Sequence, residues 1–244
     1  MTQIPGWPNG LGLTVHDRLD STNEEARRLA MKGERGPLWI VAREQTSGRG
    51  RRGRAWISER GNLFATLLTR AEGSVAAQLA FAAGLAVGET MAALAPAAEM
   101  TLKWPNDVLL NGKKAAGILL EGLGEDALAV GIGLNLAHHP KGTEFPAISV
   151  AALMGLAPTP DDALLRLAGR VTAWYEIWRG SGFAKVRTAW LARAAGLGRP
   201  IKARLEGSEI EGMFENLDED GALLVRQASG AIARVTAGEV FFES

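Results

Sequence analysis

The sequence predicts an α+β fold, in which helices pack on a mixed β-sheet over residues 1–196 and a small β-barrel follows over residues 197–244. In the first part of the 244-residue chain, short apolar runs typical of buried strands alternate with longer helical patterns. After "GLGRP" (196–200), the chain changes to short alternating segments separated by turn signals such as Asp220-Gly221. That second pattern is typical of a small barrel or sandwich.

The first ten residues are rich in Pro and Gly, and we expect them to be loosely structured. A helix is expected over 20–33, because Ser21 and Glu24 have capping-box spacing and Gly33 is a stop signal. Further helices are expected over 74–95, 161–178 and about 182–194, from apolar periodicity. Strands are expected over 37–44, 62–69, 101–104, 107–110, 116–122 and 127–136, with a hairpin turn at "NGKK" (111–114).

Composition excludes several classes of function. The chain has no cysteine, which rules out disulfides and thiolate chemistry, and its three histidines are too few and too scattered for a zinc site. Formal net charge is zero, which disfavours non-specific nucleic-acid binding. No apolar stretch approaches the roughly 20 residues of a membrane span. The N-terminus does not have the pattern of a signal peptide. A cytoplasmic protein that binds no membrane is therefore expected.

Residues 48–56, "GRGRRGRAW", concentrate positive charge in this neutral chain. Glycines expose backbone N–H groups and let the chain approach a ligand, and arginine matches carboxylates and phosphates. Trp56 offers a flat face on which a nucleobase could stack. A nucleotide or phosphate-ester site is favoured only slightly over an RNA-binding Arg-Gly segment or a solvated basic turn.

The stretch "KWPNDVLLNGKKAAG" (103–117) strengthens the small-anion interpretation. Asn106 and Asp107 alone read as turn formers, but Lys114 at the start of a buried strand can point into a cleft and bridge two anions. Gly117 would let a ligand lie against that strand. "DSTN" (20–23) reads as a helix cap by itself. "GIGLNL" (131–136) lacks the GxGxxG spacing of a dinucleotide site.

Taken in order, "DSTN", "EQTSGRGRRGRAW", "KWPND…GKKAAGILLE" and "GIGLNL" resemble the biotin protein ligase family, from about residue 13 to the C-terminus. The resemblance implies a class II synthetase-like (biotin–lipoate ligase-like) sheet with an SH3-like C-terminal barrel. It also implies an ATP-dependent reaction. Biotin is first activated to biotinyl-5′-AMP, and a lysine of a biotin carboxyl carrier protein then receives it as an amide. ATP with Mg²⁺, biotin and the carrier are the expected partners.

The resemblance also assigns residues. Lys114 is the expected main catalytic group, bridging the biotin carboxyl and the α-phosphate, and Arg51 and Arg49 join it as catalytic residues. The expected biotin-binding residues are Ser21, Thr22, Asn23, Gln45, Gly48, Arg49, Arg51 and Gly117. The expected ATP-binding residues are Arg51, Trp56, Asn106, Asp107, Lys114, Gly131 and Asn135, with Gly133 nearby. The Mg²⁺ ligands stay open, with the phosphates and Asp107 as candidates.

Three rivals remain at this point. A lipoate or octanoate ligase shares the fold but would not need the Gly/Arg loop as written. A nucleic-acid-binding module conflicts with the zero net charge. A catalytically inactive binding protein conflicts with the retained Lys114 and Arg51. Since "DSTN" begins at residue 20, the DNA-binding domain of some family members does not fit before it, and we expect a ligase without repressor function. Both a monomer and a homodimer remain open.

Overall fold

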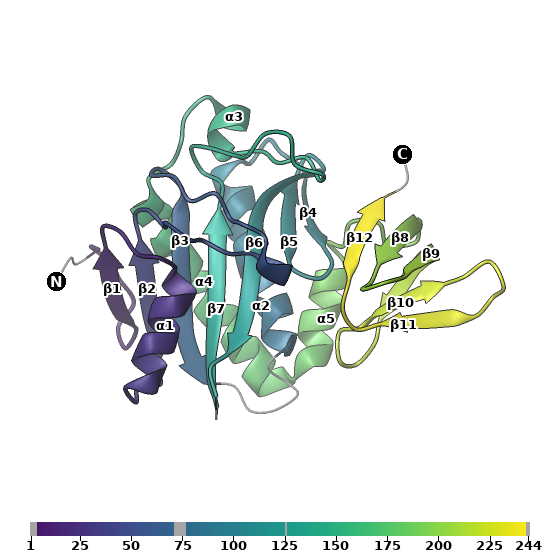
Figure 1. The fold of residues 1–244 in the computed structure, drawn as a ribbon, viewed down its shortest axis with the longest axis horizontal. Helices are drawn as coiled ribbons and strands as arrows, with labels where there is room; N and C mark the ends of the chain where they lie inside the picture. The colour runs from purple at the N-terminus through teal and green to yellow at the C-terminus, as the bar shows by residue number, and fades with distance from the viewer. Residues whose placement is uncertain (1–3, 71–76, 125, 243–244) are drawn as a thin grey trace.

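The computed structural model describes residues 4–70, 77–124 and 126–242. Its main feature is a seven-stranded sheet in the order β1-β2-β3-β7-β6-β5-β4 (Figure 1). The pair β1–β2 is parallel and the other neighbours are antiparallel, so the predicted mixed sheet is confirmed. The strands are β1 (Gly12–His16), β2 (Leu38–Ala42), β3 (Leu63–Arg70), β4 (Met100–Lys103), β5 (Asp107–Leu110), β6 (Lys113–Gly122) and β7 (Ala127–Leu134).

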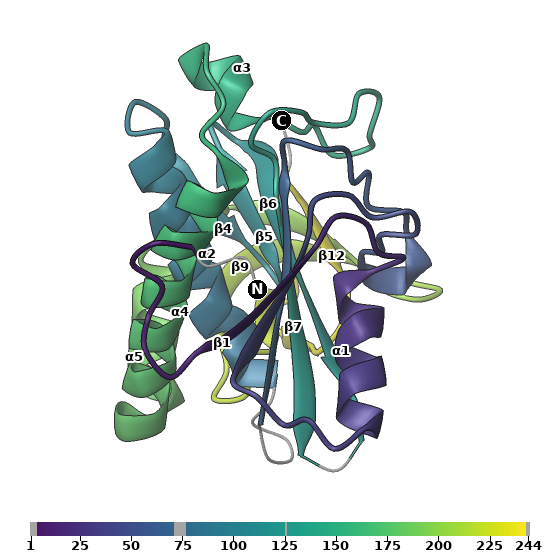
Figure 2. The same cartoon turned by 90° about the vertical axis from the view of Figure 1, so that its left-hand side faces the viewer.

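Helices cover both faces of this sheet. Helix α1 (Thr22–Met31) lies on one face, whereas α2 (Gln78–Leu94), α4 (Pro160–Ser181) and α5 (Phe183–Leu191) lie on the other (Figure 2). Helix α2 is apolar on most of its surface and is buried accordingly. Its Phe81 makes an edge-to-face contact with Trp190 of α5, with ring centroids 5.4 Å apart. The main hydrophobic core lies between the sheet and the three-helix layer, and a smaller cluster that includes Ala26, Ala30 and Ile40 lies under α1.

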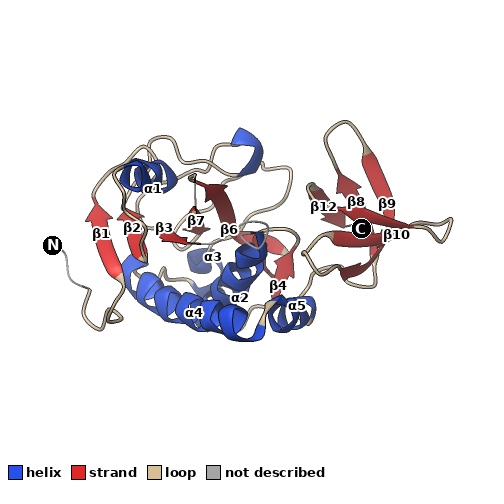
Figure 3. Ribbon diagram, turned by 90° about the horizontal axis from the view of Figure 1, so that it is seen from below, coloured by secondary structure: helices blue, strands red, loops and turns tan. Residues whose placement is uncertain are grey.

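The C-terminal residues form a five-stranded antiparallel sheet beside the first (Figure 3). Its order is β11-β10-β9-β8-β12, so β11 and β12 are its edges in the described pairings. The strands are β8 (Pro200–Arg204), β9 (Glu209–Leu217), β10 (Leu223–Arg226), β11 (Ile232–Val235) and β12 (Glu239–Phe242). The small β unit expected after "GLGRP" is thus present.

The two sheets are joined by buried contacts. The Trp104 indole donates a hydrogen bond of 3.0 Å to the carbonyl of Gly221, in the turn before β10. Gly221 has φ +88° and lies against Phe81 so closely that a Cβ there would stand 2.5 Å from its ring. This turn needs glycine both for its backbone angle and for the close approach.

Several local expectations need correction. Ser21 is the N-cap of α1, but its side chain makes no capping hydrogen bond, so the predicted capping box does not form. Strand β1 and the short helix α3 (Val150–Met154) were not predicted, and α3, with five residues, is too short for a helical period to show. The described opening residues are also packed, since Ile4 is buried and Trp7 contacts Trp39 edge-to-face. Residues 74–76 of the predicted helix 74–95 lie outside the described residues.

Candidate active site

A cleft of about 380 Å³ opens over the sheet, and segments from both sheets line it. The lining residues are 21–23, 45, 49–52, 54–57, 64, 103, 106, 107, 114, 117–119, 131–133, 135, 140, 143–145, 147, 238, 239 and 241. Of the residues assigned from sequence, the cleft brings together Ser21, Thr22, Asn23, Gln45, Arg49, Arg51, Trp56, Asn106, Asp107, Lys114, Gly117, Gly131, Gly133 and Asn135. Residues separated by more than 200 positions therefore form one site.

One end of the cleft is a network of neutral polar groups. The Gln45 Oε1 atom accepts hydrogen bonds from the backbone N–H of Thr22 (2.8 Å) and from its hydroxyl (3.2 Å). The Thr66 hydroxyl lies 2.7 Å from Thr22 Oγ1 and 2.6 Å from Asn23 Oδ1. Thr22, Asn23 and Thr66 are all buried. Such mutually bonded groups are held rigidly and suit a neutral polar ligand.

The Gln45 side chain is fixed at its other end by Ser58. The Gln45 Nε2 atom donates to Ser58 Oγ at 2.9 Å, and that hydroxyl donates to the Trp56 carbonyl at 2.8 Å. This chain of bonds connects the polar end of the cleft to the Gly/Arg loop.

Glycines on β6 and β7 let other groups lie directly on the sheet. A Cβ on Gly131 would stand 2.3 Å from Asn23 Oδ1, and one on Gly133 would stand 2.5 Å from the Trp56 ring. A Cβ on Gly117 would meet the same ring at 2.9 Å. The Trp56 indole therefore lies over Gly117 and Gly133, and its buried Nε1 has no hydrogen-bond partner among the described residues.

Two lysines flank a single carboxylate in the cleft. Lys114 Nζ lies 2.7 Å from Asp107 Oδ1, and Lys103 Nζ lies 4.0 Å from Asp107 Oδ2. The pairing register of β5 and β6 places Asp107 opposite Gly117 and Leu109 opposite Lys114, with a register irregularity between Val108 and Leu109. Lys114 Nζ is also 5.4 Å from the centroid of the Trp56 ring. The end of the Lys114 side chain thus lies beside Gly117 and the Trp56 ring.

The amides of Asn106 and Asn135 are used by the backbone. Asn106 Nδ2 donates to the Ile118 carbonyl at 2.6 Å. Asn135 Nδ2 lies 3.4 Å from the Lys114 carbonyl and 3.2 Å from that of Ile148. Both side chains therefore tie together the segments that carry the two lysines.

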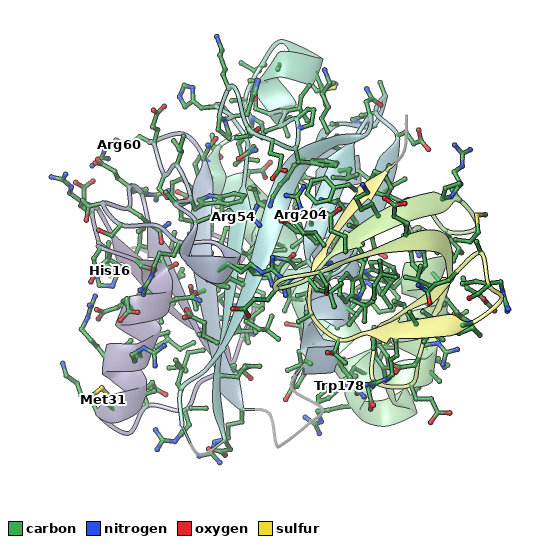
Figure 4. The ribbon with its side chains drawn as sticks, turned by 45° about the vertical axis from the view of Figure 1, so that its right-hand side comes forward. His16, Met31, Arg54, Arg60, Trp178 and Arg204 are labelled. Carbon is green, nitrogen blue, oxygen red and sulfur yellow. The ribbon has the colours of Figure 1, made fainter. Side chains whose placement is uncertain are left out.

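The Gly/Arg loop includes one 3₁₀ turn, η1 (Arg51–Gly53), and its arginines have different surroundings. Arg49 pairs with Glu24 of α1, and Arg54 pairs with Glu239 of β12, which raises the pKa of Arg54. Figure 4 labels Arg54 at the junction of the two sheets. Among the described residues, Arg51 donates one hydrogen bond, 3.3 Å, to the Gly238 carbonyl, and burial lowers its pKa. Arg51 thus keeps most of its donors free for a ligand.

Gly48 is the one assigned residue that does not line the cleft. It is buried, its carbonyl accepts the Trp56 N–H at 2.9 Å, and a Cβ would stand 2.4 Å from Ser58 Oγ. Its observed role is close packing at the base of the loop.

Sequence reasoning missed several lining residues, among them Lys103 and Glu239. Lys103 is buried at the end of β4, and its Nζ lies 3.9 Å from the centroid of the Phe145 ring. Glu239 comes from the second sheet, and no local pattern links it to the loop. For Lys103 a signal existed, since a lysine inside an apolar strand costs free energy unless it has a partner.

No group of three or more His, Cys, Asp or Glu side chains that could hold a metal ion occurs within the described ranges. Asp107 is the one candidate ligand from the sequence, and its carboxylate is occupied by Lys114. The protein groups therefore do not form a metal cage. In the same part of the chain, no helix is long and apolar enough to cross a membrane.

Comparisons with known proteins agree on one family. The model of the "Biotin/lipoate A/B protein ligase family" matches residues 15–136, and that of the "Biotin protein ligase C terminal domain" matches residues 196–243. The chain is 48% identical over 237 residues to the biotin–[acetyl-CoA-carboxylase] ligase of Paracoccus denitrificans, covering 92% of this chain and 98% of that one.

More distant relatives extend this result. The bifunctional ligase/repressor BirA of Escherichia coli is 31% identical over 253 residues, covering 99% of this chain and 77% of the relative. Among solved structures, the biotin protein ligase of Aquifex aeolicus in complex with biotin and ATP superposes with a TM-score of 0.83 at 28% identity, covering 94% of this chain and 97% of that one.

Proposed function

Since this chain belongs to the biotin/lipoate A/B protein ligase family and is a biotin protein ligase, we propose that the cleft activates biotin with ATP and transfers it to a carrier lysine. The observation that carries the residue assignments is the position of Lys114. Its ammonium lies in the cleft that also contains the neutral polar network and the Gly/Arg loop. We assign the polar network to the biotin ring system and the loop to the adenylate.

In the first step, a biotin carboxylate oxygen bonds to the α-phosphorus of ATP, and pyrophosphate leaves with the electron pair of the broken P–O bond. Two anions must approach each other, so positive charge between them lowers the barrier. Lys114 is placed to supply that charge, and Arg51 has free donors for the same anions. Asp107 positions Lys114 through the 2.7 Å contact.

In the second step, the amine of the carrier lysine attacks the biotinyl carbonyl. The C–N bond forms, the C–O bond of the mixed anhydride breaks, and AMP leaves. Until the amine arrives, the anhydride must be kept from water. We assign this task to the Gly/Arg loop, with Arg49 and Arg51 as its ligand contacts, and to Trp56. Mg²⁺ would enter bound to the triphosphate, since the described side chains form no cage for it.

The carrier is the biotin carboxyl carrier domain of a biotin-dependent carboxylase. The domain boundaries, 1–196 for the ligase domain and 197–244 for the C-terminal domain, and a cytoplasmic location are parts of the same proposal.

The test uses purified protein with ATP, Mg²⁺ and an isolated carrier domain, with biotin or lipoate in separate reactions. A mass increase on the carrier with biotin alone supports the proposal. An increase with lipoate alone would overturn it in favour of a lipoate ligase, and no increase with either would overturn it outright.

The assignment of Lys114 has its own test. Lys114→Ala is expected to slow adenylate formation by about 100-fold or more, because a cation at the reacting atoms is lost. Lys141→Ala, on an exposed loop residue, is the control. Adenylate formation by Lys114→Ala at the rate of the control would contradict the assignment.

A further inference from the structure

Lys103 is the most deeply buried cation of the cleft, and the mechanism above does not use it. It ends β4, its side chain is 3% exposed, and it is one of the lining residues. A lysine at this depth loses most of its hydration, so its ammonium needs partners that replace the water.

The protein provides only part of that replacement. The Phe145 ring centroid is 3.9 Å from Lys103 Nζ and the Phe241 ring centroid is 5.5 Å away, both within cation–π range. The nearest carboxylate oxygen, on Asp107, is 4.0 Å away and its carboxylate is already bound to Lys114. No atom of the described residues accepts a hydrogen bond from Lys103, although an ammonium has three N–H donors.

The position of Lys103 indicates which anion would accept those donors. Lys103 and Lys114 approach opposite oxygens of Asp107, so the two ammonium groups lie side by side. Lys103 lies on the side of the second sheet, where Phe241 of β12 contacts it. An anion that extends from Lys114 toward β12 therefore passes Lys103 next.

We propose that Lys103 binds the β- and γ-phosphates of ATP and stabilises the pyrophosphate that leaves. This inference rests on the proposed function, in which Lys114 contacts the α-phosphate. As the carboxylate oxygen bonds to the α-phosphorus, the α–β bridging P–O bond breaks and its electron pair goes to pyrophosphate. Lys103 donates to the oxygens that gain this charge, in a site where burial strengthens the attraction. Burial lowers the pKa of Lys103, and a bound polyanion would keep it protonated.

The two half-reactions separate this role from a structural one. Lys103→Met keeps the length of the side chain and removes its charge, so adenylate formation from biotin and ATP is expected to slow by roughly 10²- to 10³-fold. Transfer from synthetic biotinyl-5′-AMP to the carrier releases no pyrophosphate and is expected to stay within about threefold. Lys103→Arg is expected to recover much of the adenylation rate. Lys113→Met, on the exposed neighbour of Lys114, is the matched control for both half-reactions.

The outcomes also distinguish this inference from the function on which it rests. Carrier biotinylation by the wild type with normal adenylation by Lys103→Met would overturn the role of Lys103 and leave the ligase intact. Equal loss of both half-reactions would show a purely structural lysine and would overturn it too. If Lys103→Met does not fold, nuclear magnetic resonance of the ¹⁵N-labelled lysine ammonium groups of the wild type decides. The Lys103 signal should shift with inorganic pyrophosphate but not with AMP, and no shift with pyrophosphate refutes the proposal.

Discussion

Gly131→Ala is the substitution whose cost follows most directly from the structure. The new Cβ would stand 2.3 Å from Asn23 Oδ1 and 2.9 Å from Asn23 Cγ, well inside van der Waals contact. Asn23 cannot move freely, because its Nδ2 donates to Glu121 at 2.7 Å and its Oδ1 lies 2.6 Å from the Thr66 hydroxyl. Relief of the clash must therefore break at least one of these bonds.

The expected loss of stability combines two contributions. Overpacking a buried site costs about 1–3 kcal/mol, and leaving a buried polar group without its partner costs about 1–3 kcal/mol. Replacing a strand glycine by alanine returns roughly 0.5–1 kcal/mol. The net loss is about 1–5.5 kcal/mol, and at its midpoint of about 3 kcal/mol it lowers the Tm of a chain of this size by roughly 6–12 °C.

Gly122→Ala is the matched control, since Gly122 lies in the neighbouring strand β6 and a Cβ there meets nothing within 4 Å. Thermal unfolding of the two variants and of the wild type measures the difference. Calorimetric titration with biotin measures the second consequence, a loss of affinity of about tenfold or more when the polar network is displaced. Equal melting temperatures and equal biotin affinity for the two variants would refute the reasoning.

Two further predictions concern stability. Hydrogen bonds from Arg28 lower the pKa of Asp20 from 3.8 to about 2, so Asp20 stabilises the fold fully above pH 4 and loses this contribution as the pH falls toward 2. Because the pair is exposed, Asp20→Asn should lower the free energy of unfolding in urea by only about 1 kcal/mol at pH 7. At pH 2 the wild type and Asp20→Asn should be nearly equal in this free energy, and a difference as large as that at pH 7 would contradict the assignment. Trp104→Phe removes the donor to the Gly221 carbonyl and should cost about 1–3 kcal/mol, whereas Trp178→Phe, whose indole donates to the Gln78 side chain at the start of α2, should cost less. Equal unfolding free energies for the two tryptophan variants would show that the contact between the sheets adds nothing.

The elements that the sequence predicted are those with strong local signals. Apolar runs located the strands of the main sheet other than β1, and Asn111 and Gly112 both have positive φ, as the Asn-Gly turn signal predicts. Ser21 occupies the predicted N-cap position, but it lines the cleft and makes no capping hydrogen bond, an outcome that sequence spacing does not reveal.

For the site, motifs located the groups that lie near each other in the chain. The partners of the loop arginines were not predictable in the same way. Glu239 pairs with Arg54 only because β12 is the edge strand that faces the loop, and this follows from the tertiary arrangement of two sheets. Lys103 was overlooked because assigning residues 101–104 to a strand does not show which side chains of that strand end in a cleft.

The contacts of Arg51 and Arg54 with residues 238–239 have a thermodynamic consequence. A ligand that binds better when the loop is closed also binds better when β12 is docked, because the same arginines take part in both. Linkage then requires that docking of the C-terminal sheet strengthens ligand binding by the factor with which the ligand strengthens docking. If a ligand draws the loop onto the cleft, the second sheet is coupled to ligand affinity through these arginine contacts, even where it touches no ligand.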